Sequence, residues 1–517
     1  MKSKKSNEDK EKEKFLKEFT SFVQDRGFIW GPSPEIYGGV AGFYTYGPMG
    51  RLLKLKVEES VRKTFRANDF WEIETPIVLP DIVWKASGHL DTFSDKSVEC
   101  SKCKGLFRVD NIIEDVTGDP CTHYSDQQFL NAINKNNIKC PSCGGDFKYE
   151  IFVQNLMMKT KVAGKDSSLR PETATVTYLP FKRYYKFFRG KLPIGVFQIG
   201  KVFRNEISPR QHVIRGREFT QAEAQIFLDP DTKNEWERYE EIKNEKLPFW
   251  SWQSQESGKK PSVMTVESAI KKKLFKTKSY AWCVWLAYTQ FINMGVPENR
   301  MRLRQHNPDE KAFYADDAWD IEIYFQSFGW TECCGVHDRT DYDLTQHEKF
   351  SKEQLSAVKE DGTKFKPHIL EIAFGTDRPT LALLDIFYEK KEKEHGKTLF
   401  QIPYHLAPVE LMIYPLSKKP ELTKIAKKIR KELETEFDLS YDESGSIGKR
   451  YLRAAELGVP YCVTIDFDST KKKDVTIRDR DSEKQIRVKI SDLKETLKKL
   501  IKGDLKFARA GKEIKAK

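Results

Sequence analysis

The sequence lacks the features of a membrane or secreted protein. It contains no run of about 18 apolar residues, the length that a membrane-spanning helix requires. The first residues, MKSKKSNEDKEKEK, have no apolar stretch of the kind found in signal peptides. Cysteine is scarce, with 9 in 517 residues, which is far too dilute for a disulfide scaffold. We therefore expect a cytoplasmic protein that spans no membrane.

Two further features of the sequence concern nucleotide binding and net charge. There is no phosphate-binding loop of the GxxxxGKS or GxxxxGKT type, so any use of ATP must rely on another architecture. Lys and Arg total 89 against 77 Asp and Glu, a net charge of +12, which permits a polyanionic partner but does not require one. Hydrophobic residues make up 39% of the chain, which is typical of globular proteins, and its length predicts about three or four domains.

The few cysteines are not scattered at random. Cys100 and Cys103 form one CxxC knuckle, and Cys140 and Cys143 form a second one after 36 intervening residues. Each knuckle presents two thiolates from one tight turn, and two knuckles complete a tetrahedral zinc site with no open position. The metal would therefore be structural. Four unrelated reduced thiols are the alternative, and Cys121 and His123 between the knuckles are alternative ligands.

The pattern of residues changes several times along the chain. Residues 1–14 are expected to form a charged tail, and apolar residues recurring every four positions from Leu53 to Phe65 predict an amphipathic helix. Residues 231–300 fit no simple period and are interpreted as an insertion. After residue 402, strand and helix patterns alternate over about 110 residues, which predicts a small α/β domain.

Residues 196–227 contain two strand patterns joined by a basic loop. Strand parity places Arg204 and Glu206 on one face of the first strand. On the second strand, one face has the residues Phe219, Gln221, Glu223 and Gln225. Such a face cannot be a dry core, because unpaired buried charges cost several kcal/mol. It either faces water or binds a polar ligand, and the loop residues that could fold over an anion are Arg210, His212, Arg215 and Arg217.

A third informative segment follows residue 369. An apolar strand with one glutamate, Glu371, runs through a glycine turn into a helix that begins near Arg378 and Pro379. An arginine in the first turn of a helix is mildly unfavourable unless an anion is also bound there. The segment therefore indicates an anion site, and the alternative is an exposed arginine whose head simply reaches the solvent.

These segments, in this order, resemble motifs 1, 2 and 3 of class II aminoacyl-tRNA synthetases. Motif 1 would be the helix and strand ending at Pro76, motif 2 the segment from Phe203 to Phe219, and motif 3 the segment from Gly375 to Pro379. The phrases SGH at residues 87–89, RPETA at 170–174, FRNEISPR at 203–210, RLRQH at 302–306 and DRTDYDL at 338–344 narrow the resemblance. Together they resemble glycyl-tRNA synthetases of the homodimeric, archaeal or eukaryotic type.

The resemblance implies an α+β fold. Residues 15–402 would form an antiparallel-sheet catalytic domain with a zinc module at 99–146 and a further insertion at 231–300. Residues 403–517 would form the α/β anticodon-binding domain, in which the basic residues Lys449, Arg450, Arg453, Arg478 and Arg480 could meet phosphates and Tyr441 or Tyr451 could stack on a base. Motif 1 implies a homodimer. The implied reaction forms glycyl-adenylate from glycine and ATP, transfers the glycyl group to the 3′ end of tRNA(Gly), and releases AMP and pyrophosphate.

The resemblance also implies an ATP site with Mg²⁺, in which Arg204 and Arg378 are the catalytic residues. Arg204 would hold the α-phosphate, Arg217 would hold the γ-phosphate, and Glu206 would meet the adenine amino group. The base would stack between Phe219 and Arg378. The implied ATP-binding residues are Arg204, Asn205, Glu206, Ile214, Arg215, Gly216, Arg217, Glu218, Phe219, Glu332, Cys333, Gly375, Thr376, Asp377 and Arg378.

A glycine pocket is implied beside the ATP site. Two carboxylates, Glu172 and Glu371, would hold the substrate ammonium, and Arg339 its carboxylate side. The implied glycine-binding residues are Arg108, Glu172, Phe219, Thr220, Gln221, Ala222, Glu223, Arg339, Glu371, Ile372, Ala373, Phe374 and Gly375. The family pattern in motif 3 is Glu-Pro-Ser, and this sequence has Ala373 in place of the serine.

Two other functions remain open on the sequence. A synthetase-like binding or regulatory module would be expected to lose Arg204, Arg378 or the pocket carboxylates, and all are present. Another ATP-dependent ligase that activates a carboxylate would not need the anticodon-type domain.

Overall fold

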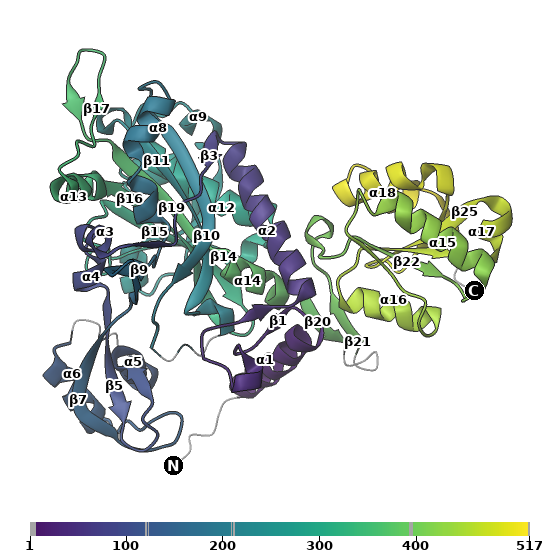
Figure 1. Ribbon diagram of the computed structural model, residues 1–517, viewed down its shortest axis with the longest axis horizontal. Coiled ribbons are helices and arrows are strands. Elements are labelled where there is room, and N and C mark those ends of the chain that lie inside the picture. The colour runs from purple at the N-terminus through teal and green to yellow at the C-terminus, as the bar shows by residue number, and fades with distance from the viewer. Residues whose placement is uncertain are drawn as a thin grey trace.

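The computed structural model describes residues 7–118, 121, 124–207, 209, 212–391 and 397–514. Figure 1 shows a large body built around one sheet, a small module beside it that includes β5 and β7, and a C-terminal domain on the opposite side. Among the described residues, no helix is both long and apolar enough to cross a membrane.

The body is built on a nine-stranded sheet. Neighbouring strands are antiparallel except at two places, where β3 pairs with β10 and β14 pairs with β12 in parallel. In spatial order the strands are β13 (Ser262–Thr265), β12 (Lys246–Trp250), β14 (Met301–Gln305), β15 (Asp317–Phe325), β16 (Gly329–Thr340), β19 (His368–Gly375), β11 (Glu218–Leu228), β10 (Ile194–Phe203) and β3 (Phe70–Glu72). This antiparallel arrangement confirms the predicted α+β core.

Three helices cover one face of the sheet. They are α2 (Pro48–Arg66), α12 (Lys278–Asn293) and α14 (Asp377–Phe387). The predicted apolar stripe of α2 is buried from Leu53 to Phe65, and it packs in one cluster with Ala222, Ala224 and Ile226 of β11. Because successive strand residues point to opposite faces, the polar residues of β11 must lie on the other side of the sheet.

One expectation about the chain needs correction. Residues 7–14 are not a tail, because helix α1 spans Asn7–Asp25 and its Phe15, Phe19 and Phe22 contact Tyr388. Residues 231–300, interpreted as an insertion, supply β12 and β13 to the sheet and α12 to its core.

The small module lies between β4 and β8 in the chain. It contains β5 (Ser94–Cys100), β6 (Leu106–Arg108), α5 (Val109–Thr117), α6 (Asp126–Lys135) and β7 (Phe147–Asn155). The strands pair in the order β6-β5-β7, and the helices bury their apolar faces against them. The end of β7 reaches the body, where the Asn205 backbone N–H donates to the carbonyl of Leu156 (2.7 Å) and Gln154 Nε2 donates to the carbonyl of Asn205 (2.8 Å).

Shorter elements connect these units. The helices are α3 (Asp81–Ala86), α4 (His89–Thr92), α7 (Ala174–Tyr178), α8 (Phe181–Phe187), α9 (Tyr239–Ile242), α10 (Trp252–Glu256), α11 (Val266–Lys271) and α13 (Tyr342–Ser351). The strands are β1 (Ile29–Trp30), β2 (Thr45–Tyr46), β4 (Val78–Pro80), β8 (Met158–Val162), β9 (Lys165–Leu169), β17 (Ala357–Val358), β18 (Lys364–Phe365), β20 (Tyr388–Lys391) and β21 (Lys397–Phe400).

The C-terminal domain has a six-stranded mixed sheet with its own core. The strands are, in spatial order, β23 (Leu439–Tyr441), β22 (Leu411–Pro415), β24 (Tyr461–Ile465), β25 (Asp474–Asp479), β26 (Gln485–Lys489) and β27 (Lys512–Ile514). The helices are α15 (Pro420–Leu433), α16 (Ile447–Glu456), α17 (Phe467–Lys472) and α18 (Leu493–Lys502). The predicted α/β domain is therefore confirmed. It contacts α2, whose Lys56 pairs with Glu410 (3.0 Å) and Asp438 (2.8 Å).

Candidate functional site

A cavity of about 390 Å³ opens on the sheet face opposite α2, α12 and α14, over β11, β16 and β19. Of the predicted site residues, it is lined by Glu172, Arg204, Glu206, Ile214, Arg215, Gly216, Phe219, Gln221, Glu223, Glu332, Cys333, Arg339, Glu371, Ala373, Phe374, Gly375, Asp377 and Arg378. Antiparallel pairing of β11 with β19 thus brings segments about 150 residues apart in the chain into one pocket.

The polar face of β11 forms the floor of this cavity. Phe219, Gln221 and Glu223 line it, and Glu223 is only 3% exposed. The solvent-facing alternative for this face is therefore wrong. The fourth predicted member, Gln225, is fully buried beyond the cavity, and its side-chain amide has no hydrogen-bond partner among the described residues.

Two arginines lie at one end of the cavity. Arg204 follows β10 immediately, its Nε donates to the carbonyl of Pro171 (3.0 Å), and its guanidinium lies 5.3 Å from the Phe219 ring centroid. Arg378, in the first turn of α14, donates from Nε to the carbonyl of Ile214 (3.1 Å) and from Nη1 to the carbonyl of Glu332 (2.6 Å). Both guanidinium groups are therefore held by backbone carbonyls, which position them without neutralising their charge.

The Glu332 side chain lies at the same end and is about half exposed. Desolvation raises its pKa, but the nearby positive charge of Arg378, at 3.6 Å, outweighs this effect and the pKa of Glu332 is lowered overall. Glu332 is therefore ionised at neutral pH. An ionised carboxylate beside two arginines suits a ligand that combines negative phosphates with a divalent cation.

The other end of the cavity is a cluster of buried carboxylates. Glu371 of β19 accepts hydrogen bonds from Tyr178 (2.9 Å), from Arg339 Nη1 (3.1 Å) and from His337 Nδ1 (3.1 Å). Desolvation raises the pKa of Glu371, but Arg339 and His337 outweigh it and the pKa is lowered overall. Arg339 also donates twice to Asp343, at 2.8 and 3.0 Å, so its guanidinium bridges two carboxylates.

Glu172 completes one wall of this cluster. It accepts from the Thr175 hydroxyl (2.7 Å) and lies 3.4 Å from His89 Nε2. Burial raises its pKa, whereas His89, Arg339 and Thr175 lower it, and the net shift is well below the usual range. Glu172 is therefore charged at neutral pH and offers a fixed anion to the cavity.

Glu223 differs from the other two carboxylates. Desolvation, followed by the charges of Glu371 and Glu172, raises its pKa to about 8, although the Thr173 hydroxyl donates to it at 2.5 Å. A cation placed between these three groups would favour the charged form of Glu223. The cluster is thus suited to bind a small ammonium group.

Several predicted site residues do not line the cavity. They are Arg108, Asn205, Arg217, Glu218, Thr220, Ala222, Ile372 and Thr376. Ala222 and Ile372 point into the core on the opposite face of the sheet. Thr220 and Thr376 are buried beneath the floor, where the Thr376 N–H donates to the carbonyl of Thr220 (2.8 Å).

The two arginines in that set have other partners. Arg217 donates to the carbonyl of Glu206 from Nε (3.1 Å) and Nη2 (2.9 Å), and to the carbonyl of Ala41 from Nη1 (3.1 Å). Arg108 is in the small module and pairs with Asp95 (3.2 Å) and Asp110 (2.5 Å). Neither arginine lines the cavity in the ligand-free protein, so the roles predicted for them stay predictions.

The cavity also includes residues that the sequence did not single out. These are Val213, Tyr314, Gly335 and His337. Tyr314 packs on the Arg339 guanidinium at 4.2 Å, and His337 contacts Glu371. No motif marks either residue; only the pairing of β16 with β19 brings His337 to the site.

The motif 2 loop covers the cavity with part of its predicted basic set. Arg215 pairs with Glu206 (3.1 Å), and His212 stacks on Tyr44 with ring centroids 5.0 Å apart. Burial lowers the pKa of His212 to about 4, so this histidine is neutral and adds no charge. Arg210 lies outside the described residues.

The four knuckle cysteines meet in the small module. The ligand atoms of Cys100, Cys103, Cys140 and Cys143 all lie within 4.8 Å of one another. Two of the sulfur–sulfur distances are 3.5 and 3.7 Å, close to the ~3.8 Å edge of a tetrahedron with Zn–S bonds of about 2.3 Å. Backbone N–H groups, first that of Cys103, lower the pKa of Cys100 to about 6, which favours the thiolate. The donor set therefore fits a structural zinc ion.

The alternative ligands are not part of this cluster. Cys121 is buried elsewhere in the module and its thiol donates to the carbonyl of Asp110 (3.5 Å). His123 lies outside the described residues. The remaining cysteines, Cys283, Cys333, Cys334 and Cys462, are buried free thiols.

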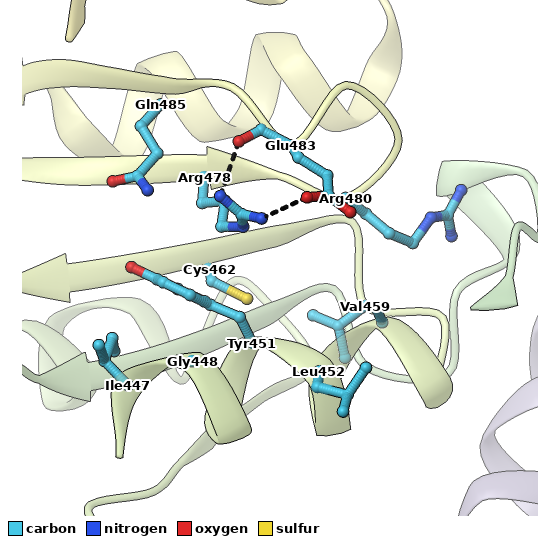
Figure 2. A pocket seen from close by; sticks show the side chains of 11 residues that line it. Ile447, Gly448, Tyr451, Leu452, Val459, Cys462, Arg478, Arg480, Glu483 and Gln485 are labelled. Atoms are coloured by element: carbon cyan, nitrogen blue, oxygen red, sulfur yellow. Dashed lines mark hydrogen bonds and ion pairs between the residues drawn. The ribbon is translucent and has the colours of Figure 1, made fainter. Parts of the chain in front are cut away.

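A second cavity, of about 410 Å³, lies in the C-terminal domain between α16 and the strands β24, β25 and β26. Figure 2 shows Tyr451 of α16 and Arg478 of β25 facing this space from opposite sides. The Arg478 guanidinium lies 4.9 Å from the Tyr451 ring centroid and donates to the carbonyl (2.7 Å) and carboxylate (2.9 Å) of Glu483. Aromatic and arginine planes of this kind suit an unpaired nucleic acid base.

Three of the basic residues expected to reach phosphates have structural partners. Arg450 is 2% exposed and donates to the carbonyls of Pro415, Leu416 and Asp442. Arg453 pairs with Asp442 (2.6 Å), and Arg480 is buried against Tyr404. Tyr441 donates to Glu443 (2.5 Å). Of the predicted set, Arg478, Arg480 and Tyr451 line the cavity, and Lys449 is exposed.

Comparison with known proteins identifies the class. A family model described as the tRNA synthetase class II core domain (G, H, P, S and T) matches residues 159–387, and an anticodon binding domain matches residues 410–500. A Cryptosporidium parvum threonyl-tRNA synthetase structure covers 93% of this chain and 97% of its own, with a TM-score of 0.58 and 18% identity. A Giardia lamblia prolyl-tRNA synthetase structure covers 93% and 75%, with a TM-score of 0.58 and 14% identity. The fold and the cavity therefore define a class II aminoacyl-tRNA synthetase.

Curated relatives narrow the class further. The glycine–tRNA ligase of Pyrococcus abyssi is 39% identical over 93% of this chain and 98% of its own. That of Methanothermobacter thermautotrophicus is 38% identical over 92% and 98%. The chain belongs to the glycine–tRNA ligase family, and it is accordingly an enzyme of the aminoacyl-tRNA synthetase type.

Proposed function

We propose that the large cavity activates glycine with ATP. The observation that supports this most strongly is the division of the cavity into two ends. The end with Arg204, Arg378 and Glu332 suits a nucleotide, and the end with Glu172, Glu223 and Glu371 suits a small ammonium group. At about 390 Å³, the cavity is within the range of small-molecule sites.

The reaction needs no covalent enzyme intermediate. The glycine carboxylate attacks the α-phosphorus of ATP in line, a new P–O bond forms, and the bond to the pyrophosphate leaving group breaks. Glycyl-adenylate and pyrophosphate result. A hydroxyl of the 3′-terminal ribose of tRNA(Gly) then attacks the glycyl carbonyl and AMP leaves. Positioning and charge stabilisation supply the catalysis, as in phosphoryl transfer generally.

Each arginine has a separate role in this proposal. Arg204 binds the α-phosphate and stabilises the charge that develops there. Arg378 holds the nucleotide from the side opposite Arg204, beneath the motif 2 loop. Glu332 would hold Mg²⁺, because an ionised, partly exposed carboxylate is the oxygen ligand that this ion prefers. When bound, Mg²⁺ would neutralise charge on the phosphates.

We propose the C-terminal cavity as the site for an anticodon base. A base would stack beside the paired Tyr451 ring and Arg478 guanidinium, and Glu483 already fixes the guanidinium through hydrogen bonds (Figure 2). Stacking on an aromatic ring contributes about 1–3 kcal/mol per base. The partner would be tRNA(Gly).

Three further features belong to the proposal. Exposed apolar side chains near β3, including Trp71 (56% exposed) and Phe187 (65%), suit the interface of a homodimer. Zinc would occupy the cysteine cluster. The cytoplasm, where translation takes place, would be the location. Light scattering tests the dimer, metal analysis tests the zinc, and cell fractionation tests the location.

The central experiment is pyrophosphate exchange with each amino acid, followed by charging of total tRNA. We expect exchange that depends on glycine and glycyl transfer to tRNA. Glycine-dependent pyrophosphate exchange without charging of tRNA would refute the ligase activity. Exchange that depends on a different carboxylic acid would indicate another carboxylate-activating ligase. No exchange with any amino acid would indicate a binding module. The Arg204→Ala variant should lose about 10²- to 10³-fold in exchange rate.

A further inference from the structure

The side chain of His337 lies between the two ends of the large cavity. It comes from β16, directly opposite Glu371 of β19 in the strand register. Its Nδ1 lies 3.1 Å from Glu371 Oε1. A carboxylate accepts hydrogen bonds and cannot donate them when ionised, so we assign the ring proton to Nδ1. The other ring nitrogen, Nε2, is then an acceptor.

The strands beneath the imidazole provide space for it. A Cβ atom on Gly335 would lie 2.8 Å from His337 Cε1 and 3.5 Å from Nε2. The far edge of the ring therefore lies directly over Gly335. Gly335 pairs with Ala373 across β16 and β19, and both line the cavity. Neither residue has a polar side-chain atom, so Nε2 supplies the polar group over this part of the floor.

His337 Nε2 is available to a ligand. Within the described ranges it has no hydrogen-bond partner, and the side chain is 18% exposed, on the cavity side. The charged or titratable groups around the ring are Glu371, Arg339, Glu332, the buried Asp320 and the His306 ring, whose centroid lies 6.0 Å away. The ring is therefore an acceptor at the junction of the amino-acid end and the nucleotide end.

We propose that His337 is a specificity-determining residue of the glycine pocket. Its Nδ1–H orients Glu371, and its Nε2 accepts a hydrogen bond from the substrate ammonium, at the part of the floor where Ala373 offers no hydroxyl. An ammonium group has three N–H donors, and Glu371, Glu172 and His337 then supply three fixed acceptors, while Glu223 lies beside the ammonium as a further negative charge. This inference rests on the proposed activation of glycine.

The consequence for selectivity is steric. An ammonium group held at three points fixes the position of the substrate α-carbon, so the molecule cannot shift to accommodate a methyl group. Without Nε2, the ammonium keeps two acceptors and gains freedom to move. Loss of His337 should therefore weaken glycine binding and also reduce the preference for glycine over alanine.

Two substitutions separate the two nitrogen atoms of the ring. The amide of Asn at position 337 reaches the place of Nδ1 and can still donate to Glu371, whereas the amide of Gln reaches the place of Nε2. If the ammonium contact is what matters, His337→Gln retains more activity at low glycine than His337→Asn. If the residue acts only by orienting Glu371, the order is reversed. Gly335→Ala provides a third variant, which keeps the histidine but displaces its ring.

The test is pyrophosphate exchange with the full-length protein, with glycine, alanine and ATP each titrated. We expect His337→Ala to raise the KM for glycine about 10- to 100-fold, as for the loss of a hydrogen bond to a charged group. The KM for ATP should stay within twofold and the alanine-to-glycine ratio of kcat/KM should rise. Adding Ala373→Ser to His337→Ala should lower the KM for glycine again, because it restores an acceptor on the floor.

A matched control is His368→Asn, since His368 lies at the start of the same strand as Glu371 but outside the cavity. Melting temperatures of all variants show whether they fold. An unchanged KM for glycine in a folded His337→Ala variant would overturn the inference, as would equal increases in the KM for glycine and for ATP. Absence of glycine-dependent exchange in the unsubstituted protein would overturn the proposed function itself, and the inference with it.

Discussion

Lys54 of α2 and Asp377 of α14 form an ion pair of 2.6 Å at the floor of the large cavity, and both side chains are almost fully buried. Lys54 also donates to the Thr220 hydroxyl (2.8 Å), while Asp377 accepts from the Thr220 N–H (2.6 Å) and the Tyr46 hydroxyl (2.5 Å). This pair therefore ties the motif 1 helix to strand β11 and to the turn that carries Arg378.

Breaking this pair should destabilise the protein and disturb nucleotide binding. Removing one partner of a buried ion pair costs about 3–5 kcal/mol, because the other charge is left unpaired. We expect Lys54→Met to lower the free energy of unfolding by that amount and to raise the KM for ATP more than that for glycine. Denaturant unfolding and pyrophosphate exchange measure the two effects. The double variant Lys54→Met with Asp377→Leu should lose less than the sum of the single losses, and additive losses would refute the coupling.

Arg378 should contribute mainly to catalysis rather than to stability. Its guanidinium contacts Glu332 and the carbonyl of Ile214 at the rim of the cavity, so its removal leaves no buried charge unpaired. We expect Arg378→Ala to lower kcat/KM for ATP by about 10²- to 10³-fold with little change in melting temperature.

The matched control for this variant is Arg430→Ala, which removes an exposed arginine of α15 that pairs with Glu434 at 3.8 Å. An exposed pair of this type is worth about 0–1 kcal/mol, and exchange activity should not change. A kcat/KM for ATP in Arg378→Ala within threefold of the unsubstituted protein would contradict the assigned role.

The sequence was sufficient to predict an element wherever the pattern that marks it is local. The stripe from Leu53 to Phe65 predicted α2, and the alternation at Phe219, Gln221 and Glu223 predicted the polar floor. Helix α12 could not be predicted, because it is buried nearly all round and has no polar face to create a period. Helix α1 was missed for a related reason: its apolar positions begin only at Phe15, after a run of charges.

The active site shows the same limit. Glu371 and Arg378 lie in one continuous motif, whereas His337 and Tyr314 reach the cavity only through strand pairing and packing against Arg339. The motif predicts a phosphate contact for Arg217, and the structure adds what the motif does not show: its guanidinium donates to the carbonyls of Ala41 and Glu206.

Loss of zinc should affect ATP binding although the cysteine cluster is distant in sequence from most of the cavity residues. The module meets the body at Asn205, which directly follows Arg204. The backbone N–H of Asn205 donates to Leu156 and its carbonyl accepts from Gln154, both at the end of β7. We expect the unsubstituted protein to bind one zinc ion per chain, and Cys140→Ser to lose that ion and to raise the KM for ATP. Elemental analysis and exchange kinetics measure these effects. Cys121→Ala, in the same module but outside the cluster, should retain zinc; zinc loss in this control, or normal ATP kinetics in Cys140→Ser, would contradict the prediction.

The elevated pKa of Glu223 predicts a specific pH dependence. Desolvation and the charges of Glu371 and Glu172 raise this pKa from an ordinary 4.5 to about 8, so the free enzyme holds the proton at neutral pH whereas the unfolded chain does not. This contribution to stability is complete below about pH 4.5 and is lost as the pH rises through 8. The melting temperature of the ligand-free protein should therefore decrease as the pH is raised from 4.5 to 8. Glu223→Gln should remove the share of this decrease that comes from Glu223.

Glycine binding should reverse the preference of Glu223 for its proton. An ammonium group beside the carboxyl favours the charged form, so glycine binds more tightly as the pH rises from 6.5 towards 8, and binding at neutral pH releases a proton. Calorimetry in buffers of different ionisation enthalpy counts the protons released. Glu223→Gln should release fewer protons, and its affinity for glycine should vary less with pH. If the unsubstituted protein binds glycine without releasing protons at pH 7, Glu223 does not change its protonation on binding and the prediction is refuted.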